Sequence, residues 1–472
     1  MNEQFIVREN PAFPSTIVGQ VAVASTDDVD AAVVAANDAQ HVWERMPLDE
    51  RRHRLLAAVR ALTAADRDHI ASTLCMELGK PMAASRSELA AALRLIDSLI
   101  EIAPQCLLPD ETLDHRGRLL VNKVPWGVVA GFLPWNAPLF VAALKLTPAL
   151  LAGNALVLKS SPLAPLAIGL LIDHLRLHLP AGVLQLLHGH ALTGQALVRH
   201  RLIRKLSFTG SANTARVIQA TSAHLIRPSL MELGGNDAAL ILDDAVLTEA
   251  DYEQLVHACF HTSGQTCIGC KRIYVPRARM DAFVGHFCRT SNRLLRIGDP
   301  QRTDVSVGPV VSAASKLRLE ELLASLHMVP GVSVINVGQV VPEDAGSSGY
   351  YVQPSVVVGL PPSSPLVCEE QFGPIVPILA YDALDDVIAD VNATDYGLGG
   401  SVWSSDLTLA FEIASRFRSG LVSINSHGRL SLMPHAPFGG MKDSGYGRES
   451  GVAGLLEYIQ YQSVFLPSTA TG

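Results

Sequence analysis

Residues 119–136 read LLVNKVPWGVVAGFLPWN, and the change of pattern inside this stretch decides the fold class. The first part mixes apolar and polar residues in alternation, which is typical of a strand with one face in water. The second part, GVVAGFL at 127–133, is continuously apolar and predicts a strand buried on both faces. Pro134, Trp135 and Asn136 then end the strand in a turn.

Strand and helix patterns alternate from residue 125 to residue 225. The apolar segments ALVLK (155–159), VLQLLHG (183–189) and KLSFTGS (205–211) are separated by helical patterns. This alternation predicts an α/β fold with a parallel, doubly wound sheet, in which ligands bind at the carboxyl ends of the strands. The polar or small residues at those ends are Asn136, Lys159, Gly189, Gly210 and Ser211.

The segments on either side follow different patterns. The first hundred residues are mostly helical: after a short extended entry at 11–24, we expect one helix behind the cap at Ser25, one from about 49 to 78, and one over 83–103. After residue 234 a second run of strands and helices begins, which is long enough for a domain of its own.

Composition narrows the class of protein. A chain of 472 residues with 48% hydrophobic and 17% charged residues is expected to fold into two or three globular domains. The net charge is −8 and no basic stripe is present, so we do not expect nucleic acid as a partner. Apolar runs are broken before about 18 residues, which argues against a membrane span and favours a cytoplasmic protein.

The segment FHTSGQTCIGC (260–270) places Cys267 directly after a bend that contains Gly264. A partly exposed thiol can act as a nucleophile in its thiolate form, whereas a buried free cysteine is usually inert packing. Cys267 and Cys270 also have the spacing of a redox or metal motif, but no second pair completes a zinc set, so no metal is expected. A reversible Cys267–Cys270 disulfide stays open as a hypothesis.

Three residues together provide the groups for covalent acyl chemistry. The thiol of Cys267 can attack a carbonyl carbon, and the amide of Asn136 can donate to the oxyanion that results. The carboxylate of Glu232, before Gly234 and Gly235, can accept a proton from the water that releases the acyl group. Each residue alone has an ordinary alternative as a turn, loop or packing residue.

The chain resembles the NAD(P)-dependent aldehyde dehydrogenase superfamily. The resemblance extends from about residue 10 to about 465, and the motifs occur in the same order and spacing as in the family. The matching motifs are PWNAP with Asn136, LKSSP with Lys159, FTGS at 208–211, ELGGN at 232–236, SGQTC ending at Cys267, EEQFGP at 369–374 and PFGGMKDSGYGRESG at 437–451. The resemblance implies a Rossmann-type cofactor domain (1–106 and 125–234), an α/β catalytic domain (235–440), and an oligomerisation arm and tail (107–124 and 453–472).

Site residues follow from the same resemblance. It implies Cys267 as nucleophile, Glu232 as general base and Asn136 as oxyanion donor. The positions implied to contact the cofactor are Lys159, Ser161, Gly189, Gly194, Gly210, Ser211, Gly234, Glu370 and Phe372. The positions implied to line the aldehyde pocket are Trp135, Thr266, Ile268, Ser426 and His427.

The implied activity is oxidation of an aldehyde to the acid with NAD or NADP, an EC 1.2.1 reaction. Glu232 favours hydrolysis over the alternative of acyl transfer to coenzyme A; a thiol esterase without cofactor turnover, or a binding protein that keeps only the fold, are further alternatives. Pro162 stands where many NAD-preferring relatives carry an acidic residue, and we lean slightly to NAD. A homodimer or homotetramer is expected.

The aldehyde itself is not named by any motif. His427 and Arg429, with Leu430 and Met433 nearby, could make the pocket polar and suit a carboxylated or hydroxylated aldehyde. The opposite interpretation, that His427 and Arg429 point to solvent, is equally open.

Overall fold

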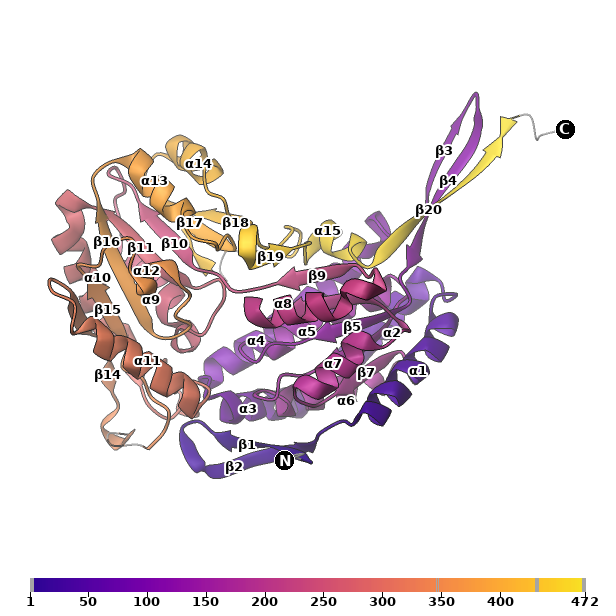
Figure 1. Ribbon diagram of the computed structural model, residues 1–472, viewed down its shortest axis with the longest axis horizontal. Coiled ribbons are helices and arrows are strands. Elements are labelled where there is room, and N and C mark those ends of the chain that lie inside the picture. Colours follow the sequence, from indigo (N-terminus) through magenta and orange to yellow (C-terminus); the bar gives the residue numbers. More distant parts are fainter. Residues whose placement is uncertain (1–3, 345, 347, 429–432, 469–472) are drawn as a thin grey trace.

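The computed structural model describes residues 4–344, 346, 348–428 and 433–468. The chain forms two lobes, each built on its own sheet, and a thin three-stranded arm extends from the first lobe (Figure 1). Within the described ranges, no helix is long and apolar enough to cross a membrane.

The first lobe is organised around the strand that the sequence pattern predicts at 127–133. Strand β5 (Val128–Phe132) lies inside a six-stranded sheet of order β19-β9-β8-β5-β6-β7 and is buried along its whole length. Its parallel pairing with β6 and β8 confirms the prediction of a parallel sheet. The other strands of this sheet are β6 (Ala155–Lys159), β7 (Leu184–Leu187), β8 (Ile203–Thr209), β9 (Ser229–Glu232) and β19 (Gly445–Tyr446), the last being antiparallel to β9.

Helices cover both faces of this sheet, because successive residues of its buried strands point to opposite sides. Leu156 and Leu158 of β6 pack into the core on one face, whereas Ala155 and Val157 pack into the core on the other. The first face carries α2 (Leu48–Arg60), α3 (Ala64–Leu78), α4 (Met82–Ile102), α5 (Pro138–Leu151), α6 (Leu166–Arg176) and α15 (Gly451–Leu456). The second face carries α1 (Thr26–Trp43), α7 (Ala191–Arg199) and α8 (Ala212–Ser222).

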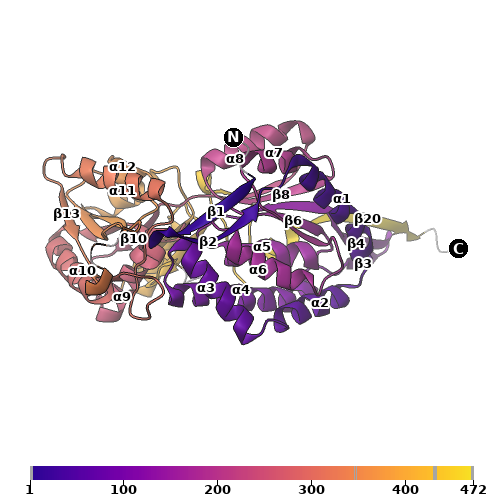
Figure 2. The same ribbon diagram turned by 90° about the horizontal axis from the view of Figure 1, so that it is seen from below.

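The amino-terminal region differs from its prediction in two places. The single helix expected over 49–78 is two helices, because Thr63 starts α3: its hydroxyl accepts from the Asp66 N–H at 3.2 Å, and the Asp66 carboxylate accepts from the Thr63 N–H at 2.9 Å. The extended entry is a hairpin of β1 (Phe5–Asn10) and β2 (Phe13–Ala22). Figure 2 shows this hairpin lying across the molecule, and Pro11 accepts a backbone hydrogen bond from Tyr350 of the second lobe at 2.8 Å.

The second lobe contains a seven-stranded sheet of order β13-β15-β16-β11-β10-β17-β18. Neighbouring strands are parallel except for β13 against β15. The strands are β10 (Asp237–Ile241), β11 (Cys270–Pro276), β13 (Ser333–Asn336), β15 (Ser355–Val358), β16 (Ile375–Tyr381), β17 (Gly399–Trp403) and β18 (Leu421–Ile424), and β12 (Arg296–Ile297) pairs with β14 (Gln339–Val340) outside it. The helices are α9 (Glu249–Phe260), α10 (Met280–Leu294), α11 (Ala313–Leu326), α12 (Pro365–Cys368), α13 (Leu384–Asn392) and α14 (Leu407–Ser415).

The arm joins two segments that lie far apart in the sequence. Strand β4 (Gly117–Pro125) pairs with β3 (Asp110–Asp114) on one side and with β20 (Ile459–Pro467) on the other. The carboxy-terminal strand therefore pairs within its own chain, from Ile459 opposite Pro125 to Pro467 opposite Gly117. Beyond Ile459 its residues are exposed.

Candidate active site

The Cys267 loop connects α9 to β11 through a backbone that most residues avoid. After α9 ends at Phe260, Thr262 and Ser263 take positive φ values of 49° and 59° in a short 3-10 turn. Gly264 follows with φ 70°, and a side chain there would collide with the carbonyl of Gly373. The bend that the sequence predicts at this glycine is therefore required by a close approach of two backbone segments.

Buried hydrogen bonds hold the loop in this strained shape. Ser263 Oγ donates to the Gly308 carbonyl at 2.7 Å, and Gln265 Nε2 donates to the Thr262 carbonyl at 3.1 Å. Gln265 Oε1 also accepts from the Val311 N–H at 3.0 Å. Non-glycine residues in the left-handed region cost about 1–3 kcal/mol each, so such bonds are needed to keep the loop in place.

Asn136 is joined to this loop directly. Its Nδ2 donates to the Gln265 carbonyl at 3.2 Å, two residues before the thiol. Its own carbonyl accepts from Lys80 Nζ at 2.7 Å, and Lys80 forms a buried ion pair with Glu88. Glu88 Oε1 also accepts from the Leu139 N–H at 3.0 Å, which satisfies a free donor in the first turn of α5. The buried pair thus fixes the turn that carries Asn136.

Glu232 ends strand β9 and is buried, with its Oε1 accepting from the Gly440 N–H at 3.2 Å. Burial raises the pKa of Glu232 well above its ordinary value, and the neighbouring carboxyl of Glu449 adds to the rise. Glu449 is itself paired with the buried Lys145 at 2.9 Å. A carboxyl with a raised pKa has the proton affinity that a general base requires near neutral pH.

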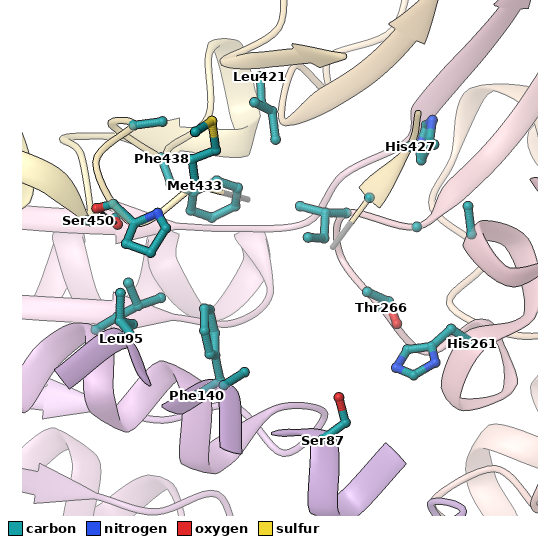
Figure 3. A pocket seen from close by; sticks show the side chains of 18 of the residues that line it. Ser87, Leu95, Phe140, His261, Thr266, Leu421, His427, Met433, Phe438 and Ser450 are labelled. Carbon is teal, nitrogen blue, oxygen red and sulfur yellow. Dashed lines mark hydrogen bonds between the residues drawn. The ribbon is translucent and has the colours of Figure 1, made fainter. Parts of the chain in front are cut away.

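Three connected spaces surround Cys267. A chamber of about 80 Å³ is lined by Cys267, Glu232 and Asn136 together. Cys267 and Asn136 also line a groove of about 1110 Å³ along the first sheet. On the other side a funnel of about 450 Å³ shares Phe140, Leu144, His261, Thr266, Ile268 and Phe438 with the chamber (Figure 3). The thiol therefore lies where a ligand in the groove and a ligand from the funnel would meet.

Most of the predicted cofactor positions line the groove, which runs along the carboxyl ends of β5, β6 and β8. These positions are Lys159, Ser161, Gly194, Gly210, Ser211, Gly234, Glu370 and Phe372. Gly189 is not among the described residues that line it; instead its carbonyl accepts from Lys159 Nζ at 2.6 Å. Burial lowers the pKa of Lys159 to about 8. Gly189 thus holds the lysine rather than forming the wall of the groove.

Glu370 and Phe372 close one side of the groove. The Gly235 N–H donates to Glu370 Oε1 at 3.0 Å, and a side chain at Gly234 would collide with the Glu370 carboxylate. The Phe372 ring packs against Trp135, with centroids 5.4 Å apart and planes at 80°. Trp135 was predicted in the aldehyde pocket, but this contact places it on the wall of the groove.

The groove fits a nicotinamide dinucleotide. Ser211 caps α8, and its Oγ accepts from the Thr214 N–H at 3.3 Å. The other N–H groups in the first turn of α8 have no acceptor within the helix and could bind a phosphate in the groove. Thr209 Oγ1 lies buried at the wall shared by groove and chamber, and no described residue is its hydrogen-bond partner. Glu370 has a second carboxylate oxygen that could accept from a ribose hydroxyl.

The thiol of Cys267 is held in its neutral form by its surroundings. Burial, followed by the carboxyls of Glu370, Glu232 and Asp237, raises its pKa to about 12 against the opposing effect of Lys271. Lys271 is buried, donates to the Gly264 carbonyl at 2.6 Å and lies 5.1 Å from the Phe372 ring centre. A positive charge brought into the groove would favour the thiolate.

The predicted aldehyde-pocket residues divide between the spaces. Thr266 and Ile268 line both the chamber and the funnel. His427 lines the funnel, but its Nδ1 is 2.7 Å from Ser401 Oγ and burial lowers its pKa to about 4, so it carries no charge at neutral pH. Ser426 is not among the described residues that line the funnel. Arg429 and Leu430 lie outside the described residues.

The structure places Cys270 away from the nucleophile. Cys270 begins β11, is buried in the hydrophobic core beside Cys259, and its Sγ donates to the Arg272 carbonyl at 3.5 Å. Cys267 faces the chamber instead, and all seven cysteines are free. Cys267 thus lines the chamber and Cys270 packs in the core, and the Cys267–Cys270 disulfide stays a hypothesis.

Several residues of the site were not identified from the sequence. They are Lys80, Glu88, Lys145, Thr209, Lys271 and Glu449. Glu449 lies inside the motif at 437–451 and Thr209 inside FTGS, so a closer look at polar residues within those motifs would have found them. Lys80 and Glu88 carry no local signal, because only the fold brings them to Asn136. Among the described residues, no cluster of three or more potential ligands for a metal ion is present.

Comparison with known proteins connects this arrangement to a family. A sequence profile with the description Aldehyde dehydrogenase family matches residues 1–464. The chain is 34% identical over 462 residues to the 4-(hydroxymethyl)benzenesulfonate dehydrogenase TsaD1 of Comamonas testosteroni, covering 97% of this chain and 94% of that protein. It is 33% identical over 461 residues to the betaine aldehyde dehydrogenase of Vibrio vulnificus (strain YJ016), covering 97% and 93%.

A solved structure agrees over nearly the whole chain. The crystal structure of a Mycobacterium tuberculosis aldehyde dehydrogenase complexed with NAD+ superposes with a TM-score of 0.92 at 33% identity. The match covers 99% of this chain and 95% of that one. At this identity and coverage the two proteins are similar in sequence along nearly their whole length as well as in fold.

Proposed function

Because this chain belongs to the aldehyde dehydrogenase family, we propose that it oxidises an aldehyde to the carboxylic acid with NAD+ or NADP+, through a covalent intermediate on Cys267. One observation carries the proposal. Cys267, Glu232 and Asn136 line a single small chamber, and this chamber shares lining residues with the groove and with the funnel.

Each of the three residues has a separate task in the proposed reaction. The sulfur of Cys267 bonds to the aldehyde carbon, and the oxyanion that forms is stabilised by Asn136 Nδ2 and the Cys267 N–H. When bound, the oxidised nicotinamide ring supplies the acceptor for the two electrons that this carbon loses. Cys267 then holds the acyl group as a thioester, and Glu232 accepts a proton from the water that cleaves it.

The pKa values support this order of events. With its pKa raised to about 12 by burial and by Glu370, the Cys267 thiol stays protonated until a further positive charge enters the groove beside it. The cationic form of the nicotinamide ring would lower that pKa by direct attraction. Cofactor binding before the aldehyde is therefore the productive order.

The decisive experiment follows cofactor reduction with a panel of aldehydes, with and without coenzyme A. We expect reduced cofactor without coenzyme A, because Glu232 lines the same chamber as Cys267 and has a carboxylate that can activate water. Cys267→Ala should lose at least about 10⁴-fold in rate, since removing a nucleophile removes the covalent route. Cleavage of an ester without any cofactor reduction would leave the protein a thiol esterase, and a strict requirement for coenzyme A would make it an acylating enzyme.

For the choice between cofactors we propose a modest preference for NAD. Pro162 has no carboxylate that would repel the 2′-phosphate of NADP, so NADP binding would depend on donors such as Ser160 and Ser161. In the structure both serine hydroxyls already form hydrogen bonds. Ser160 Oγ lies 2.8 Å from His188 Nδ1, and Ser161 Oγ accepts from the Leu163 N–H at 3.2 Å. The Ser160 hydroxyl is thus held by His188, whereas Ser161 keeps its O–H donor, so only one of the two hydroxyls is less available to a 2′-phosphate than the sequence suggests. A hundredfold higher kcat/KM with NADP would overturn the preference.

Two further predictions stay proposals. The sheets support a cofactor domain at 1–106 and 125–234 and a catalytic domain at 235–440, with the arm and tail at 107–124 and 453–472. The exposed outer edges of the arm suit assembly into a homodimer or homotetramer, since free strand edges favour pairing. The relatives do not decide the substrate, because one is named for a sulfonate and another for betaine aldehyde.

A further inference from the structure

One face of helix α4 forms a wall of the funnel. Ser87, Ala91, Arg94 and Ser98 all line it, and their spacing of four, three and four residues places them in one stripe along the helix. The same helix carries Glu88 in the chamber. Arg94 is six residues further along, so at a rise of 1.5 Å per residue it stands about 9 Å from Glu88 along the helix axis.

Arg94 gives the funnel its charge. Among the described residues that line the funnel, it is the one lysine, arginine, aspartate or glutamate side chain. It is exposed, and its guanidinium forms no hydrogen bond or ion pair with a described residue. Arg86 on the same helix is also exposed, but it is paired with Asp68 at 3.2 Å. Glu253, whose neighbour Gln254 lines the funnel, is engaged by Arg293 at 2.6 Å.

The wall shared by the funnel and the chamber is mainly apolar, with His261 and Thr266 as its polar members. Phe140, Leu144, Ile268 and Phe438 line both the funnel and the chamber. Figure 3 shows Phe140 and Leu95 projecting from the helices on one side of the opening and Phe438 and Met433 facing them from the other. A molecule whose aldehyde reaches Cys267 would therefore have its middle between apolar side chains and its far end near Arg94.

From this arrangement we propose that the preferred substrate is an aldehyde with an apolar body, such as an aromatic ring, and an anionic group at the far end. Arg94 is the residue that selects it, by pairing its guanidinium with a carboxylate or sulfonate. An uncharged aldehyde gains nothing from Arg94, and a cationic one is repelled. The inference rests on the proposed function, since it names the substrate class of the same site.

A matched panel of aldehydes tests this selectivity. The full-length enzyme is assayed with benzaldehyde, 4-formylbenzoate, 4-formylbenzenesulfonate and 4-(trimethylammonio)benzaldehyde, which share the ring and differ in charge. We expect kcat/KM for at least one anion to exceed that for benzaldehyde by at least about fivefold, mainly through KM, because a pairing at an exposed arginine is modest. A preference for carboxylate over sulfonate, or the reverse, identifies which anion the funnel accepts.

Variants at Arg94 should change the ratio of the anion to benzaldehyde in kcat/KM. Arg94→Gln should reduce this ratio to about one, Arg94→Lys should keep part of it, and Arg94→Glu should make the cation the better substrate. Raising the salt concentration should reduce the ratio in the native enzyme but not in Arg94→Gln. Arg86→Gln removes the same charge from the same helix outside the funnel, and its ratio should equal that of the native enzyme.

Failure of this inference is distinguishable from failure of the proposed function. If benzaldehyde is oxidised but the anions show no advantage, or if Arg94→Gln retains the native ratio, Arg94 does not select the substrate and the inference is overturned. If no aldehyde of any charge yields reduced cofactor, the proposed function itself fails.

Discussion

The groove and the funnel meet at Cys267, yet they are built in different ways. The groove is lined by short runs of neighbouring residues at strand ends, such as 159–162 and 208–211. The funnel is lined by single residues taken at intervals from helix faces and loops, such as Ser87, Ala91 and Arg94 of α4. The groove therefore leaves contiguous motifs in the sequence, whereas the α4 wall of the funnel leaves none; the funnel shares Pro437 and Phe438 with the motif at 437–451.

Backbone geometry explains this difference. In the groove and the nucleophile loop the main chain itself makes the close contacts: Gly234 leaves room for the Glu370 carboxylate, and Gly264 leaves room for the Gly373 carbonyl. Such positions tolerate few residue types. In the funnel the contacts are made by side-chain ends, so any residue of suitable size or charge can occupy Ala91, Arg94 or Met433. The residues proposed for the reaction thus belong to sequence motifs, whereas residues proposed to select the substrate, such as Arg94, lie on a helix face without a motif.

Among the variants compared here, Glu232→Gln on the chamber side is expected to reduce the steady-state rate most. Without its general base, release of the acyl group should slow by about 10²–10⁴-fold, while formation of the thioester continues. A rapid-mixing experiment should therefore show one equivalent of reduced cofactor per site in a fast burst, followed by a slow steady rate. Cys267→Ala serves as the control and should show no burst. A steady rate equal to the native enzyme would remove Glu232 from the mechanism.

An intermediate effect is expected on the groove side, for Glu370→Gln. After burial, the charge of Glu370 is the largest cause that raises the pKa of Cys267, so its loss should lower that pKa. Below the thiol pKa the thiolate fraction rises as the pKa falls, so alkylation of Cys267 by iodoacetamide at pH 8 should accelerate, on the order of tenfold per unit of pKa. The KM for the cofactor should rise in the same variant, because the proposed contact of Glu370 with a cofactor ribose would be weakened.

Glu369→Gln provides the matched control for this experiment. Glu369 lines the groove beside Glu370 but is exposed and is not among the groups that shift the Cys267 pKa. Its alkylation rate should stay near that of the native enzyme. Slower alkylation in Glu370→Gln than in Glu369→Gln would contradict the assigned cause of the raised pKa.

The contrast between the groove, which is built from motifs, and the funnel, which is built largely from scattered side chains, also explains which features the sequence could predict. The buried strand at 127–133, the parallel sheet, the family and the motif residues around Cys267 followed from local patterns and motifs. The break of the 49–78 helix at Thr63 depended on a capping box that the helical period concealed. The directions of the Trp135 and Cys270 side chains could not be derived from local patterns, because they depend on distant contacts: Trp135 packs on Phe372, and Cys270 lies in the core of the second lobe beside Cys259.

The buried ion pairs show a different limit. Lys80 with Glu88, and Lys145 with Glu449, join residues of separate elements, and each pair reaches the chamber through Glu88 or Glu449. Glu88 of α4 and Lys145 of α5 look like ordinary surface charges within their helical patterns, and Lys80 and Glu449 look like loop charges. All four are buried by residues that lie far away in the sequence, and such long-range packing has no local signature.

The smallest effect is expected in the funnel, for Met433→Ala. Met433 is 67% exposed, so its truncation should change the free energy of unfolding by no more than about 0.5 kcal/mol. It lines the funnel opposite Leu95 and Phe140, so kcat/KM for 4-substituted benzaldehydes should change a few-fold, whereas acetaldehyde, which need not reach the funnel, should change less than twofold (Figure 3).

Met328→Ala is the control for this last comparison, because Met328 is 82% exposed and lines neither funnel, chamber nor groove. It should leave all aldehydes unchanged. The KM for the cofactor should equal the native value in both variants, since Met433 touches only the funnel side of Cys267. If Met433→Ala raised the cofactor KM more than it changed aldehyde selectivity, the two sides of the thiol would be coupled, and substrate choice could not be assigned to the funnel alone.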